Sequence, residues 1–256
     1  MFCKIDLIPK EDKFDYDKMV DALWDFSSVL YYNGQILKNY KLIFDKIFTL
    51  YVNFPKTDSF DEKYDNVYVK RERAKIKELF DYEVTYLGRN LLSTDYCECK
   101  KRSAIEMQTD LIDIDSVFTC CDCGKPVALY ELPFCDEEKE YWCVNNWQQN
   151  FSSMHRLWMN GLCDRYTGNQ LVNLDSALNR DGLSIAEDMR KKLDCKVYYN
   201  AFDDLTGKVK YNMVGDTAIR YCPKCGNLMR RVKFTENYEV DVCDPCNLTS
   251  DVIQNP

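Results

Sequence analysis

The sequence predicts an α+β protein, and three observations lead to this prediction. Strand-like and helix-like apolar patterns alternate through residues 1–90, and apolar residues recur at helical spacing from about Asp136 to Leu193. Paired cysteines stand on both sides of that helical stretch. We therefore expect four consecutive parts. They are an α+β domain at 1–90, a first cysteine-rich element at 91–133, a mainly helical segment at 134–215 and a C-terminal cysteine-rich element at 216–256.

The N-terminal part has the order strand, helix, strand, strand, helix, strand. Met19 and Leu23 share one face of the first helix, and Asn33-Gly34 is a turn signal after it. The predicted strands are Phe2–Ile8, Gln35–Tyr40, Lys46–Phe54 and Tyr82–Leu87, and the predicted helices are Tyr16–Leu30 and Tyr68–Phe80. This order matches the ferredoxin-like βαββαβ arrangement. The basic run from Lys70 to Lys77 is then the solvated face of the second helix.

The helical segment carries three apolar stretches. They contain Trp142, Trp147, Phe151, Leu157 and Trp158, then Leu171, Leu174 and Leu178, and then Ile185, Met189 and Leu193. Large apolar residues at helical spacing more often fill a core than line a ligand cage, so we expect a packed core here. A strand is expected at Lys196–Phe202, before the C-terminal cysteines.

Fourteen cysteines in 256 residues are unusually many, and their spacing indicates zinc binding. In the pairs Cys222–Cys225 and Cys243–Cys246 two residues separate the cysteines, so that one turn presents both sulfurs to the same ion. Gly226 can adopt the positive φ that such a turn needs. Four thiolates bind a tetrahedral Zn²⁺ at about 2.3 Å, and we therefore predict a C-terminal zinc ribbon. A redox dithiol is the alternative, and two pairs at ribbon distance argue against it.

A second zinc site made of four cysteines is predicted in the first cysteine-rich element. Cys120 and Cys123 form another pair with a two-residue gap, followed by Gly124. The nearest upstream pair is Cys97 and Cys99, which has a one-residue gap. Such a gap occurs in zinc sites where one ligand comes from an extended segment. Two zinc ions per chain are therefore expected.

The other cysteines have less definite roles. Cys135 or Cys143 is an alternative ligand of the first site, and this alternative stays open. Cys121 lies inside the turn of the Cys120 pair and is expected to point elsewhere. The isolated cysteines, which are expected to be buried free thiols, are Cys3, Cys163 and Cys195.

No catalytic constellation is recognisable in the sequence. His155 is the single histidine, and it has no nucleophile at a recognisable spacing. There is no HExxH motif, no Ser–His–Asp pattern and no P-loop. Zinc sites made only of cysteine are closed, whereas catalytic zinc keeps an open position. We therefore expect a protein that is not an enzyme, in which His155 packs within a helix.

Composition indicates a soluble protein of the reducing cytoplasm. The first residues lack the basic start and long apolar run of an export signal, and no stretch approaches the ~20 apolar residues of a membrane span. The formal net charge is −8, and two zinc sites of four thiolates, each with a charge of −2, change it to −12. Such a charge repels nucleic acid and attracts a basic protein, although acidity also serves solubility alone.

Several segments in combination resemble a bacterial protein family of unknown function. They are CCDCGKPVALYELP, the region of Trp147 and Leu157, LDSALNRDGLSIAEDM, VYYNAF, and RYCPKCG followed by VDVCDPCNLTS. The family is described as Zn-ribbon-containing, with a suggested role in nucleic-acid binding. The resemblance covers most of the chain from about Cys97 onward. It implies that the eight paired cysteines bind zinc, and it leaves the function open.

Three function classes compete. The favoured one is a protein that binds a macromolecular partner, such as an immunity protein or antitoxin that covers a basic, nuclease-like toxin. The alternative is a nucleic-acid-binding ribbon, in which Arg230, Arg231 and Lys233 form a basic strip. Between Arg220 and Asp251 the sequence has five basic and five acidic residues. The ribbon as a whole is therefore not basic, and the strip is only a local feature. An enzyme of unrecognised type is the least favoured class.

Overall fold

The computed structural model describes residues 1–135, 139–202, 211–215 and 217–252. Over these residues the protein is a mixed α+β structure that divides into two compact units. The first unit contains Met1–Tyr96, Ile114–Ser116 and Ala128–Trp142, and the second contains Cys97–Asp113, Val117–Val127 and Cys143–Pro256. All eight cysteines predicted to bind zinc fall in the second unit. The expected helical start at Asp136 and the expected ribbon limits at 216 and 256 lie outside the described residues.

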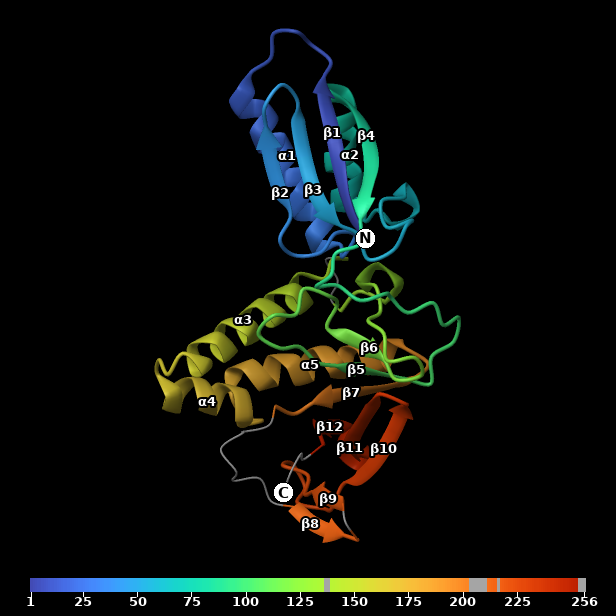
Figure 1. Cartoon of the computed structure of the whole chain (residues 1–256), viewed down its shortest axis with the longest axis vertical. Helices are drawn as coiled ribbons and strands as arrows, with labels where there is room; N and C mark the ends of the chain where they lie inside the picture. Colours follow the sequence, from blue (N-terminus) through green and yellow to red (C-terminus); the bar gives the residue numbers. More distant parts are fainter. Residues whose placement is uncertain (136–138, 203–210, 216, 253–256) are drawn as a thin grey trace. The chain divides into compact units, whose positions relative to one another are not determined.

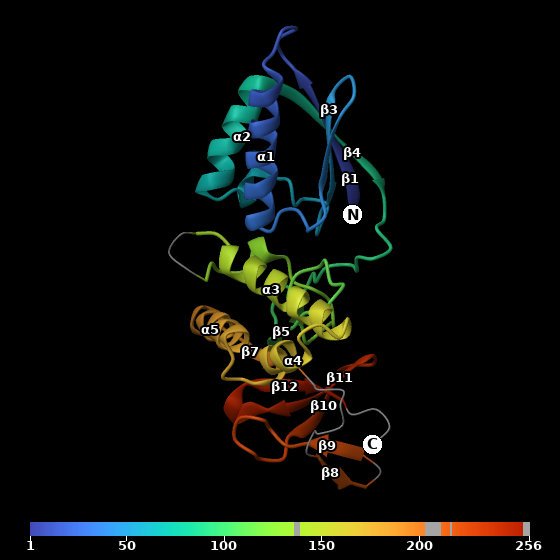
Figure 2. The same ribbon diagram turned by 90° about the vertical axis from the view of Figure 1, so that its left-hand side faces the viewer.

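The first unit is a four-stranded sheet with two helices on one face (Figures 1 and 2). Its elements are β1 (Phe2–Pro9), α1 (Tyr16–Tyr32), β2 (Lys41–Phe44), β3 (Phe48–Asn53), the short η1 (Glu62–Tyr64), α2 (Val67–Leu79) and β4 (Phe80–Gly88). The strand order is β2-β3-β1-β4, and every neighbouring pair is antiparallel. A second short helix, η2 (Leu129–Glu131), also belongs to this unit.

Local sequence sets the helix starts and the buried face of this sheet. The carboxylate of Asp15 accepts the backbone N–H of Lys18 at the start of α1, and the Asn66 side chain accepts from Val69 at the start of α2. Alternate residues of β1 and β3 are buried beneath the helices, as the two-residue period of a strand requires. The core of the unit includes Ile5, Leu7, Leu23, Phe26, Phe48, Leu50, Ile76 and Phe80.

The strand expected at Gln35–Tyr40 is wrong, because β2 begins only at Lys41. Gly34, at φ +73°, turns the chain sharply after α1. The Gln35 side chain is then fully buried, and its amide donates to the carbonyl of Ser59 and to the Asp65 carboxylate at 2.9 and 3.1 Å. A polar side chain satisfied by loop groups fixes an irregular segment here, and single-sequence patterning could not detect those distant partners.

The second unit is built on a six-stranded sheet with the order β10-β11-β12-β7-β5-β6. The strands are β5 (Ala104–Met107), β6 (Phe118–Cys120), β7 (Lys196–Asn200), β10 (Arg230–Thr235), β11 (Tyr238–Cys243) and β12 (Leu248–Asp251). β7 pairs in parallel with both β5 and β12, so it joins the two cysteine-bearing parts of the chain. A separate hairpin consists of β8 (Tyr211–Val214) and β9 (Thr217–Arg220).

Three helices follow the first cysteine-bearing part. They are α3 (Trp142–Met159), α4 (Asp164–Val172) and α5 (Ala177–Lys192). The first and third agree with the predicted stretches, whereas the second predicted stretch, Leu171 to Leu178, spans the end of one helix, a non-helical segment at 173–176 and the start of the next. Gly182 allows α5 to approach its neighbours closely, since a Cβ at this position would lie 2.5 Å from the Tyr199 ring and 2.6 Å from the Trp147 indole. Trp147, Phe151, Ile185 and Met189 are buried as expected, whereas Trp142 and Leu157 are 51% and 39% exposed. Among the described residues, no helix combines the length and apolar character needed to cross a bilayer.

Candidate metal centres

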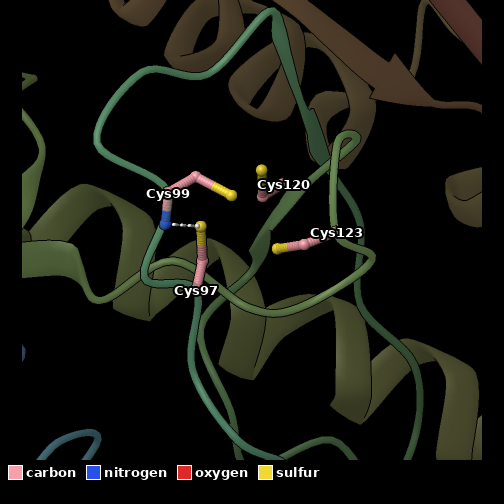
Figure 3. Close-up of side chains that lie close together, drawn as sticks. All are labelled: Cys97, Cys99, Cys120 and Cys123. Carbon is pink, nitrogen blue, oxygen red and sulfur yellow. Dashed lines mark hydrogen bonds between the residues drawn. The ribbon is translucent and has the colours of Figure 1, made fainter.

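The first cysteine group consists of Cys97, Cys99, Cys120 and Cys123, whose sulfur atoms all lie within 4.8 Å of one another. Figure 3 shows the four side chains pointing toward a common centre. Cys120 ends β6 and Cys123 lies in the following turn, whereas the other two come from the segment before β5. The two segments are joined by the backbone N–H of Cys97, which donates to the carbonyl of Pro126 at 2.8 Å.

The second group consists of Cys222, Cys225, Cys243 and Cys246, and its sulfur atoms meet the same 4.8 Å limit. Cys222 and Cys225 lie in the turn after β9. Cys243 ends β11, and Cys246 ends the short helix η3 (Asp244–Cys246). Asn247 then turns the chain into β12 at φ +51°, a left-handed conformation that asparagine tolerates.

The turns at Cys120 and Cys222 share one hydrogen-bond pattern. In the first, the N–H of Gly124 donates to the Cys120 carbonyl, and the N–H of Cys120 donates to the Lys125 carbonyl, both at 2.8 Å. In the second, Gly226 donates to Cys222 at 2.9 Å, and Cys222 donates to Asn227 at 2.8 Å. The glycines have φ values of +69° and +73°, which explains why glycine follows the second cysteine of each pair.

The distances between sulfur atoms fit a tetrahedral metal site. The Sγ atoms of Cys225 and Cys243 are 3.7 Å apart. A disulfide requires about 2.05 Å, whereas the edge of a tetrahedron with 2.3 Å metal–sulfur bonds is about 3.8 Å. All eight cysteines of the two groups are free thiols. The geometry of the second group is therefore that of a ligand set.

Electrostatics in each group favour a bound cation. Burial and the neighbouring Cys97 and Cys123 raise the pKa of Cys99 to about 11. In the second group a hydrogen bond from the Asn227 backbone lowers the pKa of Cys225 to about 7, while burial and the Cys225 sulfur raise the pKa of Cys246 to about 11. Four adjacent thiols cannot all ionise without compensation. A dication supplies that compensation and deprotonates the ligands.

Hydrogen bonds at Cys97 stabilise its thiolate form. The Arg102 guanidinium and the backbone N–H of Cys99 both donate to the Cys97 sulfur, each at 3.4 Å. Burial raises the pKa of Cys97, but these donors, together with the neighbouring thiols of Cys123 and Cys120, outweigh it, so that the pKa lies below its ordinary value. On the turn of the same site, the Asp122 carboxylate accepts the Ser103 N–H at 2.7 Å. These contacts orient the ligands of the first group.

Asp244 connects the second group to the central strand of the sheet. Its carboxylate accepts from Arg230 at 2.7 Å, and from Lys196 and the Tyr198 hydroxyl at 2.9 Å. The Arg230 and Lys196 cations hold the pKa of Asp244 well below its usual range. Since Asp244 directly follows Cys243, these contacts tie the second cysteine turn to β7 and β10.

The structure brings together the same two quartets that the sequence predicted. Cys135 and Cys143, the alternative ligands, belong to neither group, and Cys121 is buried apart from the first quartet. Of the isolated cysteines, Cys3 is buried, Cys195 is partly buried and Cys163 is exposed, so the expectation of burial is wrong for Cys163.

Sequence reasoning missed Arg102 and Asp244. Arg102 carried a usable signal, since a cation five residues beyond the predicted ligand Cys97 can reach its thiolate. Asp244 stands inside the CDPC motif, but its cationic partners are distant in sequence and could not be paired with it. His155 lies against the rings of Phe151, Trp158 and Phe202, and burial lowers its pKa.

Comparison with known protein families finds a match for the middle part of the chain. A protein-family model described as a domain of unknown function (DUF2310) matches residues 99–202. This segment includes Cys99, Cys120 and Cys123 and ends before the second group. Comparison with curated proteins finds no match. Over residues 99–202, the chain is therefore similar to a family whose function is undefined and whose description names neither a metal nor a ribbon.

Proposed function

We propose that each cysteine group holds one Zn²⁺ and that both ions are structural. The observation that carries this proposal is the convergence of four sulfurs within 4.8 Å in each group, at positions set by matching turns. Four thiolate ligands complete a tetrahedron and leave no position for a substrate or water. Zinc at these sites fastens loops to strand ends and does no chemistry. We accordingly propose a non-catalytic protein.

Elemental analysis of the purified protein tests the metal proposal. We expect two zinc ions per chain, because both groups offer four closely placed thiols. Cys97→Ser should lower the ratio to one, whereas Cys163→Ser, at an exposed cysteine outside both groups, should leave it at two. Iron in place of zinc would contradict the choice of metal, since four thiolates also suit iron. A ratio near zero would contradict both sites.

We also propose names for the two architectures. The first unit has the element order and antiparallel strand order expected of a ferredoxin-like βαββαβ domain. The second cysteine group, with β9 to β12, has the paired turns of a zinc ribbon. Both names rest on topology, and a topology alone assigns no function.

For the function itself, we propose that this acidic zinc protein binds a basic protein partner. The best candidate is a nuclease-like toxin, which the chain would inhibit as an immunity protein or antitoxin. The net charge of −8 becomes −12 with two zinc sites of four thiolates, and such a field speeds encounter with a positive partner. A toxin that holds nucleic acid must carry a positive active face, and an acidic protein lying over it blocks substrate.

The alternative is nucleic-acid binding through the ribbon, and the ion pairs around its basic strip weigh against it. Arg230 is paired with Asp244, and Arg231 is paired with Asp241 at 2.7 Å and with Glu239 at 3.8 Å. Arginines neutralised within the chain release fewer counterions on phosphate contact, so they add little affinity for nucleic acid.

Co-expression with basic, toxin-like proteins encoded nearby tests the partner. We expect co-purification and survival of cells that the toxin alone kills, because the acidic protein covers the toxin's active face. Fluorescence anisotropy with labelled DNA and RNA at about 150 mM salt provides the counter-test. Sub-micromolar binding with a steep salt slope, together with no rescue by co-expression, would replace this proposal with the nucleic-acid alternative.

A further inference from the structure

The two helices of the first unit share an outward face with exposed charged side chains and an exposed tryptophan. α1 and α2 lie side by side on one face of the sheet (Figure 2). α1 presents Met19, Leu23 and Phe26 to the core. We call the opposite sides of α1 and α2 the outer helical face. On α1 it carries Asp17, Lys18, Asp21, Trp24 and Asp25, and on α2 it carries Val67, Lys70, Arg71, Ala74, Lys75 and Glu78.

The acidic stripe of α1 costs stability in the isolated chain. Asp17, Asp21 and Asp25 follow one another at four-residue spacing, so their carboxylates are neighbours along the helix. Like charges at this spacing are destabilising, and aspartate is a poor helix former away from the first turn. No cation among the described residues forms an ion pair with these three carboxylates. A positive surface laid against them would offset this cost.

The outer side of α2 offers such a surface. Arg71 and Lys75 share a single carboxylate, that of the nearly buried Glu72, at 2.7 and 2.6 Å. Two cations on one anion leave an excess positive charge. Lys70 adds another, and no described residue forms an ion pair with it, so the outer side of α2 stays positive although Glu78 also lies on it. The two helices therefore present opposite charges on one continuous face.

A large apolar side chain stands at the middle of the acidic stripe. Trp24 lies near the centre of α1, and it is 61% exposed. Ala74 lies near the centre of α2 and is also exposed, with the Arg71 guanidinium one turn away. Tryptophan is the residue type most enriched among interface hot spots, and its ring attracts cations. A small residue next to an arginine leaves room for an indole ring to pack and offers it a cation.

From these features we infer that the outer helical face pairs with the same face of a second copy, with α1 of each chain against α2 of the other. A twofold arrangement makes every contact twice, because the interface is isologous. Each acidic stripe then meets a basic one, and each Trp24 packs on the Ala74 of its partner chain. This self-association goes beyond the proposed partner binding and does not depend on it.

A charge-exchange experiment by sedimentation velocity tests this pairing in the full-length, zinc-loaded protein. At about 50 mM salt the chain should sediment with twice its 30.2 kDa mass, and dimerisation should weaken as salt screens the charges. The acid-reversed variant is Asp21→Lys with Asp25→Lys. The base-reversed variant is Lys70→Glu, which leaves both the Glu72 ion pairs and Ala74 unchanged. Each variant alone should be monomeric, and an equimolar mixture should form a heterodimer.

Two controls keep the result interpretable. Asp181→Lys with Glu236→Lys makes the same charge change on exposed residues of the second unit, and it should leave the dimer unchanged. Trp24→Ala should weaken dimerisation by about 30-fold, as expected for an interface hot spot, while circular dichroism shows an intact fold.

Three results would overturn the inference. They are a wild-type chain that stays monomeric at low salt, reversed variants that remain dimeric alone, and variants whose mixture stays monomeric. If the wild type is monomeric and a basic protein binds it through Asp21 and Asp25, the face belongs to a different partner.

Discussion

Cys222→Ser is expected to unfold the C-terminal part that carries the second cysteine group, while the rest of the chain stays folded. Cys222 is almost fully buried, and its backbone closes the turn that also positions Cys225. Structural zinc contributes roughly 10–16 kcal/mol of folding free energy in zinc-finger peptides. Fewer apolar residues are buried around β10 to β12 than in the first unit. The folding of these strands therefore depends on a bound metal more than the folding of the first unit does.

Limited trypsin digestion measures this loss. The peptide bonds after Arg230 and Arg231 lie in β10, where pairing with β11 protects them in the wild type. In Cys222→Ser we expect cleavage there to become at least tenfold faster, with zinc content falling from two to one. Cys163→Ser is the matched control and should behave as the wild type. An unchanged cleavage rate would show that β10 and β11 hold together without this ligand.

The cysteine quartets were predictable because their geometry is largely local. A Cys-x-x-Cys-Gly segment determines its own turn, through glycine at positive φ and backbone hydrogen bonds that span only a few residues. Cys120 and Cys222 could therefore be assigned from spacing alone. Helix α1 was predictable for a related reason, since its apolar face and its Asp15 cap are encoded within the segment itself.

Long-range pairing could not be predicted in the same way. β7 joins β5 to β12 in parallel, and no local pattern indicates that Val197 lies beside Ile105 and that Tyr199 lies beside Leu248. The burial of a charged residue within the sheet could not be predicted for the same reason. Glu106 stands in a four-residue strand whose other members are apolar, and only the assembled sheet shows that its carboxyl group is buried.

The burial of Glu106 leads to the second large expected effect, on stability against pH. Its Oε1 accepts from the Asn200 amide at 3.3 Å, and its Oε2 has no hydrogen-bond partner among the described residues. The same amide donates to Asp251, so a second carboxylate lies nearby. No cation of the described residues forms an ion pair with Glu106. Burial chiefly, and the Asp251 charge in addition, raise the pKa of Glu106 to about 7.

The direction of the pH dependence follows from the two protonation states. The unfolded chain releases this proton near the ordinary pKa of 4.5, whereas the folded chain keeps it until about pH 7. Between these values the folded state binds one more proton than the unfolded state, so stability falls as pH rises. Above pH 7 the fold carries the full cost of a buried carboxylate, about 3 kcal/mol on the scale of 1.36 kcal/mol per pKa unit.

Glu106→Gln should remove this cost because the amide has nearly the same shape and no charge. At pH 8 we expect the variant to be more stable than the wild type by about 3 kcal/mol, and the advantage should shrink to about 2 kcal/mol at pH 6. Urea unfolding of the zinc-loaded proteins at the two pH values measures it. The single histidine, His155, is present in both proteins, so its own titration cancels in the difference.

Asp251→Asn is the matched control for this measurement. Asp251 is exposed, so neutralising it should change stability by less than about 1 kcal/mol at either pH. Its removal should also lower the pKa of Glu106 slightly, because a nearby negative charge is lost. An advantage of Glu106→Gln that is the same at pH 6 and pH 8 would mean that the carboxyl group titrates outside this range. A variant less stable than the wild type at pH 8 would mean that the carboxylate is compensated by a cation in solution.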